Sequence, residues 1–386
     1  MAIPLNYNLR SLRVRSRTTV VTALAVALSV AIAVFSSALA SGIRHVFART
    51  GDPLNIVATR SGADSEYMSM ISRDAVPTIE QLPGIAKSND GTPLVSAEAI
   101  GLILLSKLDG SGDSNITVRG MKPVGFALRS RIRLVQGRWF QSGVRELVIS
   151  RSIQDRFSST SLGDSIHFGK GDWTIVGVFD GSGSAQDSEV WGDLDIILAD
   201  MNRPRYASVL IRAADAGSMS TLTTLLSNDK RLRLHAVSEN EYYSRQSETG
   251  QTAELTSLLA AAILAIGSCF ALANAMFAAT ASRVKEIATL RIIGFSRGSV
   301  LIAFLMEAIM ISLIGGILGI LVVSPLSRFT TGTLNSFTFS EVVFKPEFSP
   351  AVLSQGILLA ILLGVFGGIL PAFLAAFQRL PSIIRD

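Results

Sequence analysis

The residues that could carry out catalysis do not form a known catalytic pattern in this sequence. Serines and acids are plentiful, but H-E-x-x-H does not occur, and the single G-x-S-x-G match, at 294–298, lies in a basic link and not between a strand and a helix as a catalytic serine of that motif requires. His45, His167 and His235 are far apart, and Cys269 is the one cysteine, which excludes a disulfide framework and a Cys-based zinc site. We therefore predict no catalytic residue, no metal site and no cofactor on this chain, and we expect that it is not an enzyme.

The segment 163–171 comes nearest to a phosphate-binding loop. A Walker A motif has four residues between its glycines and Ser or Thr after its lysine. Here five residues separate Gly163 from Gly169, and Gly171 follows Lys170. The pattern is typical of a strand and its turn, so ATP hydrolysis on this chain is not expected.

The segment 283–297, with the sequence RVKEIATLRIIGFSR, is more informative. Its apolar residues recur every third position, Arg283 and Glu286 can pair along a helix, and Gly294 can end that helix. We interpret it as a helix that docks on a cytoplasmic partner, through Arg283, Val284, Glu286, Ile287, Leu290, Arg291 and Gly294. The alternative is an ordinary basic loop that obeys the positive-inside rule.

Glu307 is a carboxylate inside an apolar region, where a charge at the bilayer centre costs about 2.5–3.5 kcal/mol. Because residues 308–327 can span a membrane alone, we expect Glu307 near the inner boundary. The alternative is a contact with a neighbouring helix or with the 283–297 link. A proton relay is disfavoured, since the apolar runs hold no second acid.

Four long runs without Asp, Glu, Lys or Arg must position these residues: 18–43, 255–282, 308–327 and 348–378. Each reaches the ~20 residues that a bilayer-spanning helix needs. We predict four spanning helices, the third extended to 298–327. The first run also resembles a signal peptide that ends at 38–40, but it exceeds the usual apolar core of about 7–15 residues. An uncleaved helix is favoured.

Small residues in these runs are predicted to let helices pack closely. Glycines four positions apart allow neighbouring backbones to approach. Two such pairs occur, and we assign Gly315, Gly319, Gly364 and Gly368 to helix packing together with Glu307.

Composition agrees with a membrane protein. Apolar residues make up 48% of the chain and charged residues 17%, against about 25% in globular proteins. This excludes disorder, a coiled coil and a collagen-like fibre. The net charge of +5 arises beside the apolar runs and indicates topology, so no nucleic-acid partner is expected.

The flanking cations set the orientation. The amphipathic segment 1–17, the link 283–297 and the tail 379–386 are more basic than acidic, so we place them in the cytoplasm. The segment 44–254 and the short loop 328–347 are then periplasmic.

The segment 44–254 has the composition of a soluble α+β domain. Strand patterns are predicted at 54–58, 100–105, 146–149, 165–168, 173–179, 196–198, 208–211 and 232–236, and helices near 73–82, 150–157 and 216–227. Turn signals include the run Gly181-Ser182-Gly183-Ser184. We predict two strand–helix–strand pieces, a strand-rich insert at about 110–195 and a helical stalk at 237–254.

This layout resembles the permeases of the MacB/FtsX family of ABC transporters, which includes the lipoprotein-release permeases. The segment 283–294 with Glu307 is similar to the family's R-x-x-E-I-G-x-L-R-A-x-G segment and downstream glutamate, with Ala288 for the usual glycine and Ile292 for the usual alanine. Residues 137–140, 162–164 and 175–178 resemble its G-R-x-F, G-x-x-I and V-V-G-V runs, and 371–381 its P-A-x-x-A-x-x-x-x-P tail.

The resemblance implies a permease dimer, of two copies or of two related permeases, above ATPase subunits that hold ATP and Mg. It also implies no continuous pore: ATP binding closes the permeases and moves their outer domains by mechanotransmission, with 283–294 as the coupling helix. Because 17 residues precede the first run, we expect the ATPase on a separate chain.

We therefore predict a permease subunit in a bacterial cytoplasmic membrane, with both termini inside, for efflux or extraction of substrate from the periplasm or outer leaflet. The alternative is an FtsX-like signalling protein that activates cell-wall hydrolases without transport. A secondary transporter is disfavoured, because the runs lack paired charges. Macrolide, peptide, lipoprotein and glycolipid substrates stay open, and a periplasmic adaptor with an outer-membrane channel would be a third component.

Overall fold

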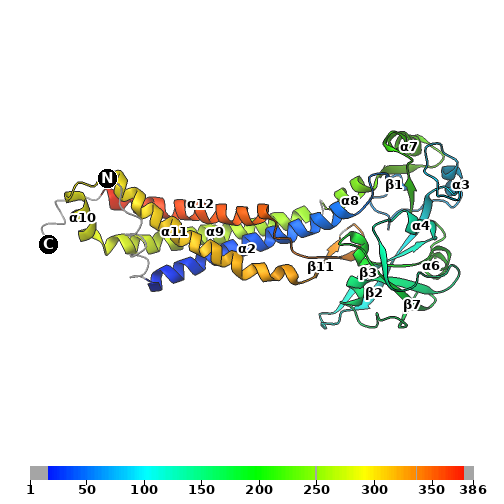
Figure 1. The fold of residues 1–386 in the computed structure, drawn as a ribbon, viewed down its shortest axis with the longest axis horizontal. Coiled ribbons are helices and arrows are strands. Elements are labelled where there is room, and N and C mark those ends of the chain that lie inside the picture. The colour runs from blue at the N-terminus through cyan, green and yellow to red at the C-terminus, as the bar shows by residue number, and fades with distance from the viewer. Residues whose placement is uncertain (1–15, 248–249, 336, 378–386) are drawn as a thin grey trace. The chain divides into compact units, whose positions relative to one another are not determined.

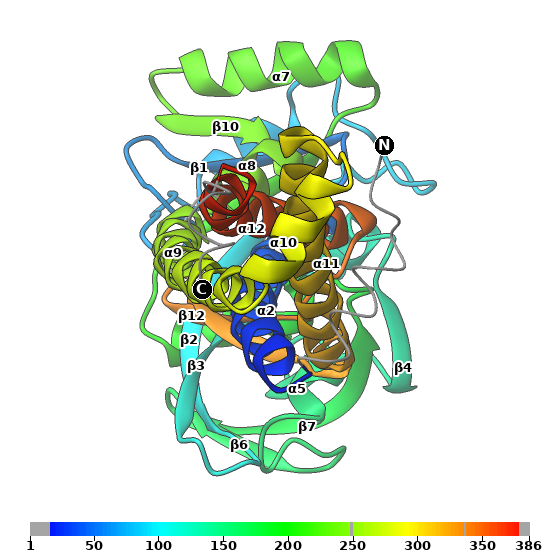
Figure 2. The same ribbon diagram turned by 90° about the vertical axis from the view of Figure 1, so that its left-hand side faces the viewer.

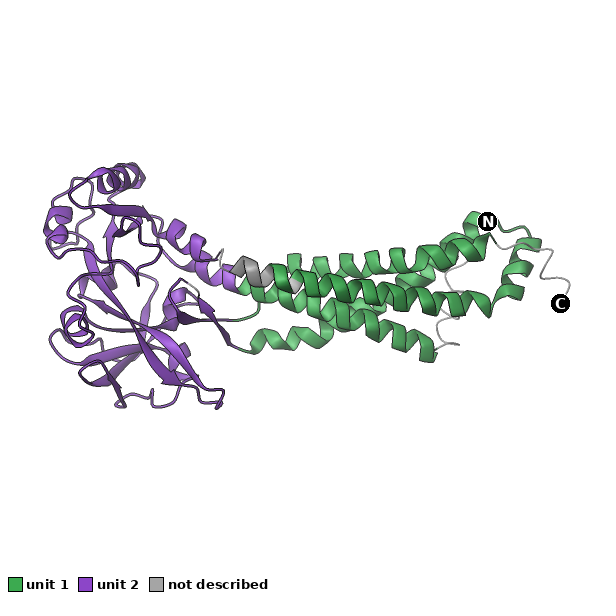
Figure 3. Cartoon of the chain, turned by 180° about the vertical axis from the view of Figure 1, so that it is seen from behind, with its two compact units in different colours: residues 1–42, 251–329, 345–386 green, residues 43–250, 330–344 purple. Residues whose placement is uncertain are grey.

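The computed structural model of the 386-residue chain describes residues 16–247, 250–335 and 337–377 (Figure 1). The chain forms two compact units, which Figure 3 shows in different colours. Unit 1 comprises residues 1–42, 251–329 and 345–386, and unit 2 comprises residues 43–250 and 330–344. The predicted periplasmic loop 328–347 thus contributes most of its residues to unit 2.

Unit 1 is helical. Its elements are α2 (Ser16–Arg49, which continues into unit 2), α9 (Gly250–Ala281), α10 (Val284–Ile292), α11 (Arg297–Val323), η2 (Ser324–Arg328) and α12 (Pro350–Ala376). In the described part of the chain, four helices are long and apolar enough to cross a membrane: α2, α9, α11 with η2, and α12. The prediction of four membrane helices is confirmed.

The amphipathic segment predicted at 1–17 and the tail at 379–386 lie outside the described residues, apart from positions 16 and 17.

Both predicted glycine pairs lie where helices of unit 1 touch. A Cβ built on Gly315 would stand 2.5 Å from the carbonyl oxygen of Ala23 in α2, and Gly319 meets the Ala27 carbonyl in the same way. On α12, a Cβ on Gly364 would stand 2.7 Å from Cα of Ile309 in α11. The glycines therefore let α11 approach α2 and α12 at backbone distance.

A hydroxyl pair links α2 to α9 within unit 1. The Oγ atoms of Ser29 and Ser268 are 2.6 Å apart, and Ser29 donates a hydrogen bond to the Leu264 carbonyl at 3.0 Å. Both side chains are buried. Buried hydroxyls need such partners, since an unpaired polar group costs free energy in an apolar environment.

Unit 2 is built on a ten-stranded sheet and a separate hairpin. The strands are β1 (Asn55–Arg60), β2 (Val95–Ser106), β3 (Asp113–Met121), β4 (Arg133–Gly137), β5 (Glu146–Ser150), β6 (Ser165–Phe168), β7 (Gly171–Asp180), β8 (Glu189–Asp193), β9 (Ser208–Arg212) and β10 (Leu234–Ser238). The hairpin consists of β11 (Thr331–Asn335) and β12 (Ser340–Phe344).

The two predicted strand–helix–strand pieces interleave within one sheet. The strand order is β10-β1-β9-β2-β3-β8-β5-β7-β4, with β6 paired to β7. Strand β9 pairs antiparallel with both β1 and β2, so the second piece enters between the strands of the first. This is a split βαβ arrangement. The strands from β3 to β8 extend the same sheet beyond β2.

Short helices connect these strands. They are α3 (Ala75–Glu80), α4 (Val124–Ala127), α5 (Arg151–Gln154), η1 (Ala185–Ser188), α6 (Leu194–Asp200), α7 (Ala216–Asn228) and α8 (Glu239–Ser247). A single apolar cluster runs through the strands and includes the fully buried Trp173. A second cluster forms around Trp191, whose ring stacks on Phe179 with centroids 4.2 Å apart. The α+β class predicted for this segment is confirmed.

The predicted strand at 196–198 is wrong, because these residues lie in α6. Asp193 caps that helix: its carboxylate accepts the amide protons of Asp195 and Ile196. A short apolar run does not distinguish a buried strand from a buried helix. Strands β3, β4, β8, β11 and β12 are not among the predicted strands.

The stalk predicted at 237–254 is helical where it is described. Helix α8 covers Glu239–Ser247 in unit 2, and α9 begins at Gly250. Residues 248 and 249 lie outside the described residues.

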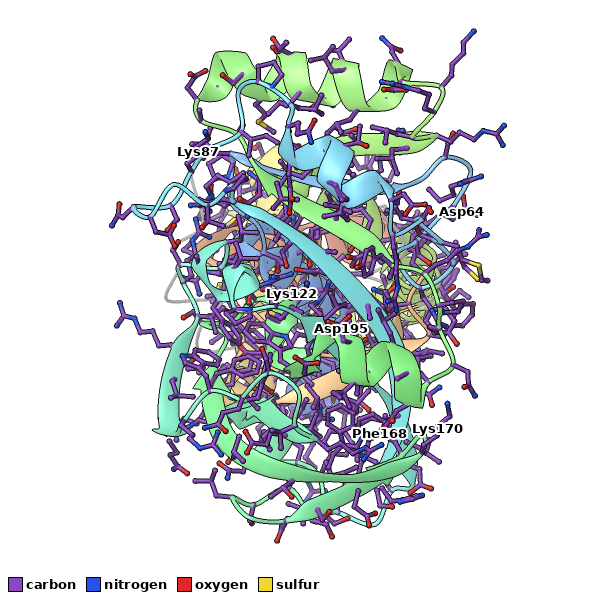
Figure 4. The ribbon with its side chains drawn as sticks, turned by 90° about the vertical axis from the view of Figure 1, so that its right-hand side faces the viewer. Asp64, Lys87, Lys122, Phe168, Lys170 and Asp195 are labelled. Carbon is purple, nitrogen blue, oxygen red and sulfur yellow. The ribbon has the colours of Figure 1, made fainter. Side chains whose placement is uncertain are left out.

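Figure 4 shows a face of unit 2 on which charges of both signs are dispersed. Asp64, Lys87, Lys122, Lys170 and Asp195 are labelled there and come from separate segments. Such mixing is typical of a solvated surface.

The glycine contacts predict a steric test. Gly364→Leu should destabilise the helices of unit 1 by about 1–3 kcal/mol, because the new side chain has to displace α11. Gly267→Leu in α9 is the matched control, since a Cβ there has nothing within 4 Å. The measurement is the thermal midpoint of the helical circular dichroism signal in detergent. Equal midpoints for the two variants would contradict the packing.

Candidate functional site

Helix α10 lies across the helices of unit 1, as Figure 2 shows in the view along them. One face of α10 packs inward: Ile287 and Ala288 are buried. Ile287 belongs to an apolar cluster with residues of α2, α9, α11 and α12, among them Ala23, Leu272, Phe304 and Ala372. Ile287 therefore joins the short helix to the apolar core of the bundle.

A buried ion pair fixes the start of α10. Arg283, the residue before the helix, places Nη1 3.0 Å from Oε2 of Glu307 in α11. The two side chains are only 7% and 5% exposed. Of the alternatives for Glu307, the structure shows the contact with the 283–297 link. Such a pair offsets the cost of burying either charge alone.

The end of α10 is fixed by backbone hydrogen bonds. The amide of Phe295 donates to the Leu290 carbonyl at 3.1 Å, and the amide of Gly294 donates to the Arg291 carbonyl at 3.3 Å. Gly294 has φ +109°. This is a Schellman motif, in which glycine adopts the positive φ that other residues avoid. Both ends of α10 are thus held independently.

The other residues assigned to this contact are spread around α10. Glu286 is exposed, whereas Val284, Leu290 and Arg291 are half-buried. Ile287 faces the bundle, so its side chain is not available to a partner. The exposed apolar side chains lie just after them: Ile292 is 64% exposed and Ile293 68% exposed. Ile292 is the last residue of α10, and Ile293 comes directly after it.

The hairpin β11–β12 is attached to the rest of unit 2 by an ion-pair cluster. Glu341 lies 2.5 Å from Nη2 of Arg156 and 3.1 Å from Nζ of Lys107. The Val343 amide also donates to Oγ of Ser188 at 2.8 Å. A side chain at Gly332 on the opposite strand would collide with the Glu341 carboxylate. Glycine at this position lets the carboxylate reach its partners.

Electrostatics favour the ionised form of Glu341. Burial alone would raise its pKa, but hydrogen bonds from Ser114 and Arg156 and the nearby cations outweigh burial and lower the pKa. The carboxylate is therefore ionised and paired at neutral pH.

A second buried cluster lies under α8. Arg119 in β3 contacts Glu66 at 3.0 Å, Glu98 at 2.6 Å and Glu189 at 2.7 Å. Arg129 shares Glu98 at 2.7 Å. The ion pairs therefore connect strands β2, β3 and β8 to one another and to the two segments that follow β1 and α4.

Helix α8 packs onto this cluster. The amide of Glu66 donates to the hydroxyl of Tyr242 at 3.1 Å. Glu239 accepts hydrogen bonds from the amide of Asp52 and from Nδ2 of Asn55, at 2.9 and 2.8 Å. Four residues of α8 are buried: Glu239, Tyr242, Tyr243 and Gln246. Helix α8 is thus an integral part of unit 2.

Sequence reasoning had not found these clusters. Arg119 and its partners are spread from position 66 to position 189, and no local spacing marks them. Arg156 and Glu341 are equally distant along the chain. The sequence shows charged residues such as Glu98 within apolar strand-like runs, but it does not show which residues they pair with.

The interpretation of 163–171 as a strand with its turn is confirmed. Strand β6 pairs antiparallel with β7, and the register joins Phe168 to Gly171. Lys170 in the turn donates to the Ala199 carbonyl at 2.8 Å.

Two family models together match most of this chain. The model described as MacB-like periplasmic core domain matches residues 19–228, more than half of the chain. The model described as FtsX-like permease C-terminal matches residues 258–380.

Curated relatives agree with these models. The macrolide export ATP-binding/permease protein MacB of Rhodopseudomonas palustris strain HaA2 is 26% identical over 371 residues, which cover 86% of this chain and 55% of that protein. The protein of the same name from strain BisB18 is 28% identical over 376 residues, with 86% and 55% covered. The chain spans about half the length of the curated relatives it matches.

A solved structure is also similar to part of the chain. It is the periplasmic region of MacB from Actinobacillus actinomycetemcomitans, with 14% identity and a TM-score of 0.37. The match covers 49% of this chain and 90% of that one.

The Arg283–Glu307 pair predicts opposite effects of single and double replacement. Arg283→Met or Glu307→Met should destabilise unit 1 by about 3–5 kcal/mol, because each leaves a buried charge without its partner. The double variant R283M/E307M should recover most of that loss. Cys269 in α9 is the one cysteine, so labelling by a thiol-reactive dye on heating reports opening of the helices. Single variants as stable as the native chain would contradict the pair.

The Glu341 cluster predicts pH-dependent attachment of the hairpin. Glu341→Gln at neutral pH should speed amide hydrogen exchange in 331–344 by about tenfold, since hydrogen bonds to charged groups contribute about 1.5–3 kcal/mol. Because the folded-state pKa is lowered, this stabilisation is present above the ordinary pKa of glutamate and is lost as pH falls through the folded pKa. Below the folded-state pKa, the hairpin of the native chain and the hairpin of the variant should therefore exchange at the same rate.

A matched control for Glu341→Gln is Glu241→Gln. Glu241 pairs with Arg245 on the exposed side of α8, where both side chains are about half exposed. An exposed pair of this kind contributes about 0.3–0.5 kcal/mol. Similar exchange rates in the hairpin for both variants would show that Glu341 does not attach it.

Proposed function

The chain belongs to the MacB/FtsX-like family of ABC transporter permeases, and on that premise we propose that it couples a cytoplasmic ABC ATPase to movements of unit 2. In this proposal, the permease lies in the bacterial inner membrane with both termini cytoplasmic. It works as a dimer and drives efflux or extraction of a substrate from the periplasm or the outer leaflet. ATP and Mg bind to the ATPase.

The observation that carries this proposal is the two-sided character of the 283–297 segment. Its inner side is fixed to the bundle by Arg283–Glu307 and by Ile287. Its outer side presents Ile292 and Ile293, each more than 60% exposed. Adjacent exposed isoleucines in a link between two membrane helices are costly in water and are typical of a surface that a partner covers.

The attachment to the bundle gives such a contact a mechanical consequence. A force applied at Ile292 and Ile293 reaches α11 through the ion pair, because Glu307 belongs to that helix. Helix α11 leads through η2 into the hairpin, and the hairpin is held within unit 2 by Glu341. The covalent chain therefore links the proposed ATPase contact to unit 2.

The proposed docking residues are revised by this geometry. Ile292 and Ile293 replace Ile287 in the proposed apolar contact, since Ile287 is buried in its own bundle. The half-buried Val284 and Leu290 stay part of the proposed contact. Glu286 is exposed beside them and keeps its proposed role at the edge. Arg283 and Gly294 are proposed to act by positioning the segment.

The proposal predicts the effect of charge at the exposed isoleucines. I292E/I293E should abolish co-purification with the ABC ATPase and its stimulation by the permease, because two carboxylates would be buried in the contact. The chain itself should stay folded, since both side chains are exposed. ATPase activity of the reconstituted complex in nanodiscs is the measurement.

The matched control is M68E/M70E in unit 2. These methionines are 59% and 58% exposed, so the chemical change and its exposure are similar. The control should leave assembly and ATPase stimulation unchanged. Native assembly and stimulation by I292E/I293E would overturn the proposed contact.

A further inference from the structure

Unit 2 contains a cavity that the coupling proposal does not use. Its volume is about 410 Å³, within the range of about 300–1,000 Å³ that ligand pockets occupy. Four segments of unit 2 enclose it: the end of α2, the loop between α4 and β4, the Gly/Ser run after β7 and the start of α8.

Arginines dominate the charged lining of this cavity. Arg49, Arg129, Arg131 and Arg133 all line it. Arg129 is buried and held by Glu98. Arg49, Arg131 and Arg133 are exposed, and in the described part of the chain none of these three forms an ion pair with a carboxylate. Three exposed arginines that form no ion pair with a described carboxylate therefore line one cavity.

Backbone contacts hold this arrangement in place. Arg131 donates through Nη1 to the carbonyl oxygen of Arg49 at 2.9 Å, which joins the loop to the end of α2. The Ser182 hydroxyl donates to the Arg131 carbonyl at 3.2 Å, which joins the same loop to the Gly/Ser run. The arginines consequently stand on segments that are tied together.

The lining also includes three acids. Asp52 pairs with Arg212 at 2.9 Å, and Glu239 accepts from Asn55 at 2.8 Å, where burial raises its pKa. Asp180 stands opposite Arg133 in the β4–β7 register and accepts the amide of Ser182 at 2.8 Å. Asp180 therefore offsets part of the charge of the three arginines, and the remaining positive charge favours an external anion.

We propose that this cavity binds a phosphoryl group, either free or carried by a lipid headgroup. Guanidinium groups present planar pairs of N–H donors that match phosphate oxygens. Arg131 and Arg133 flank the loop, and Arg49 completes the set from α2. This site is independent of the ATPase contact and does not rest on the coupling proposal.

The test uses the full chain and two probes. Inorganic phosphate is titrated by calorimetry into the chain in phosphatidylcholine nanodiscs. In a second arm, phosphatidylcholine discs with and without phosphatidic acid are compared by the thermal midpoint of tryptophan fluorescence. All three tryptophans lie in unit 2, so this signal reports the unit that holds the cavity. Binding of free phosphate identifies a soluble ligand, and a response to phosphatidic acid alone identifies a headgroup.

The arginines are tested by neutral replacement. R131Q/R133Q should weaken whichever probe binds by at least about tenfold, because a charged hydrogen bond contributes that much to a binding constant. R151Q/R205Q removes two exposed arginines outside the cavity and should bind normally. If R131Q/R133Q does not fold, R49Q tests the same site from α2. The proposal would be overturned if neither probe binds. It would also be overturned if R131Q/R133Q and R151Q/R205Q bind a probe with equal affinity.

Discussion

A charged side chain stays buried among apolar helices only when an opposite charge is buried with it, and Glu307 meets this condition through Arg283. The pair joins α11 to the start of α10, twenty-four positions earlier in the chain. The Schellman motif at Gly294 fixes the other end of α10. Ile292 and Ile293 must then remain outside, since Ile287 already fills the inward face. One buried ion pair thus determines which side of the segment can meet a partner.

The same logic of buried charge holds unit 2 together around the elements that connect it to the helices. Arg119 gathers three glutamates beneath α8, and Glu341 gathers two cations around the hairpin. Because residues 43–250 and 330–344 form one compact unit, the chain passes between the units four times. Under the proposed function, movement of the helices in unit 1 would act on unit 2 through these covalent connections.

Sequence patterns identified what depends on local composition. The charge-free runs predict the membrane helices, and Gly294 predicts the end of α10. The partner of Arg283 could not be predicted, because Glu286 offers the same local pairing and only the packed bundle brings Glu307 close. Likewise, the run 196–198 is equally apolar in a strand or a helix, and the cap at Asp193 decides for α6. Ile287 and Ile292 have the same chemistry, so only burial separates the core residue from the exposed one.

In the proposed function, an ATPase-side event at α10 reaches the hairpin of unit 2. Amide hydrogen exchange of the assembled permease and ATPase, compared between ADP and a non-hydrolysable ATP analogue, tests it directly. We expect the ATP analogue to change exchange both in α10, at Val284–Ile292, and in the hairpin, at 331–344. A change confined to α10, with the hairpin and α8 unaffected, would contradict this coupling.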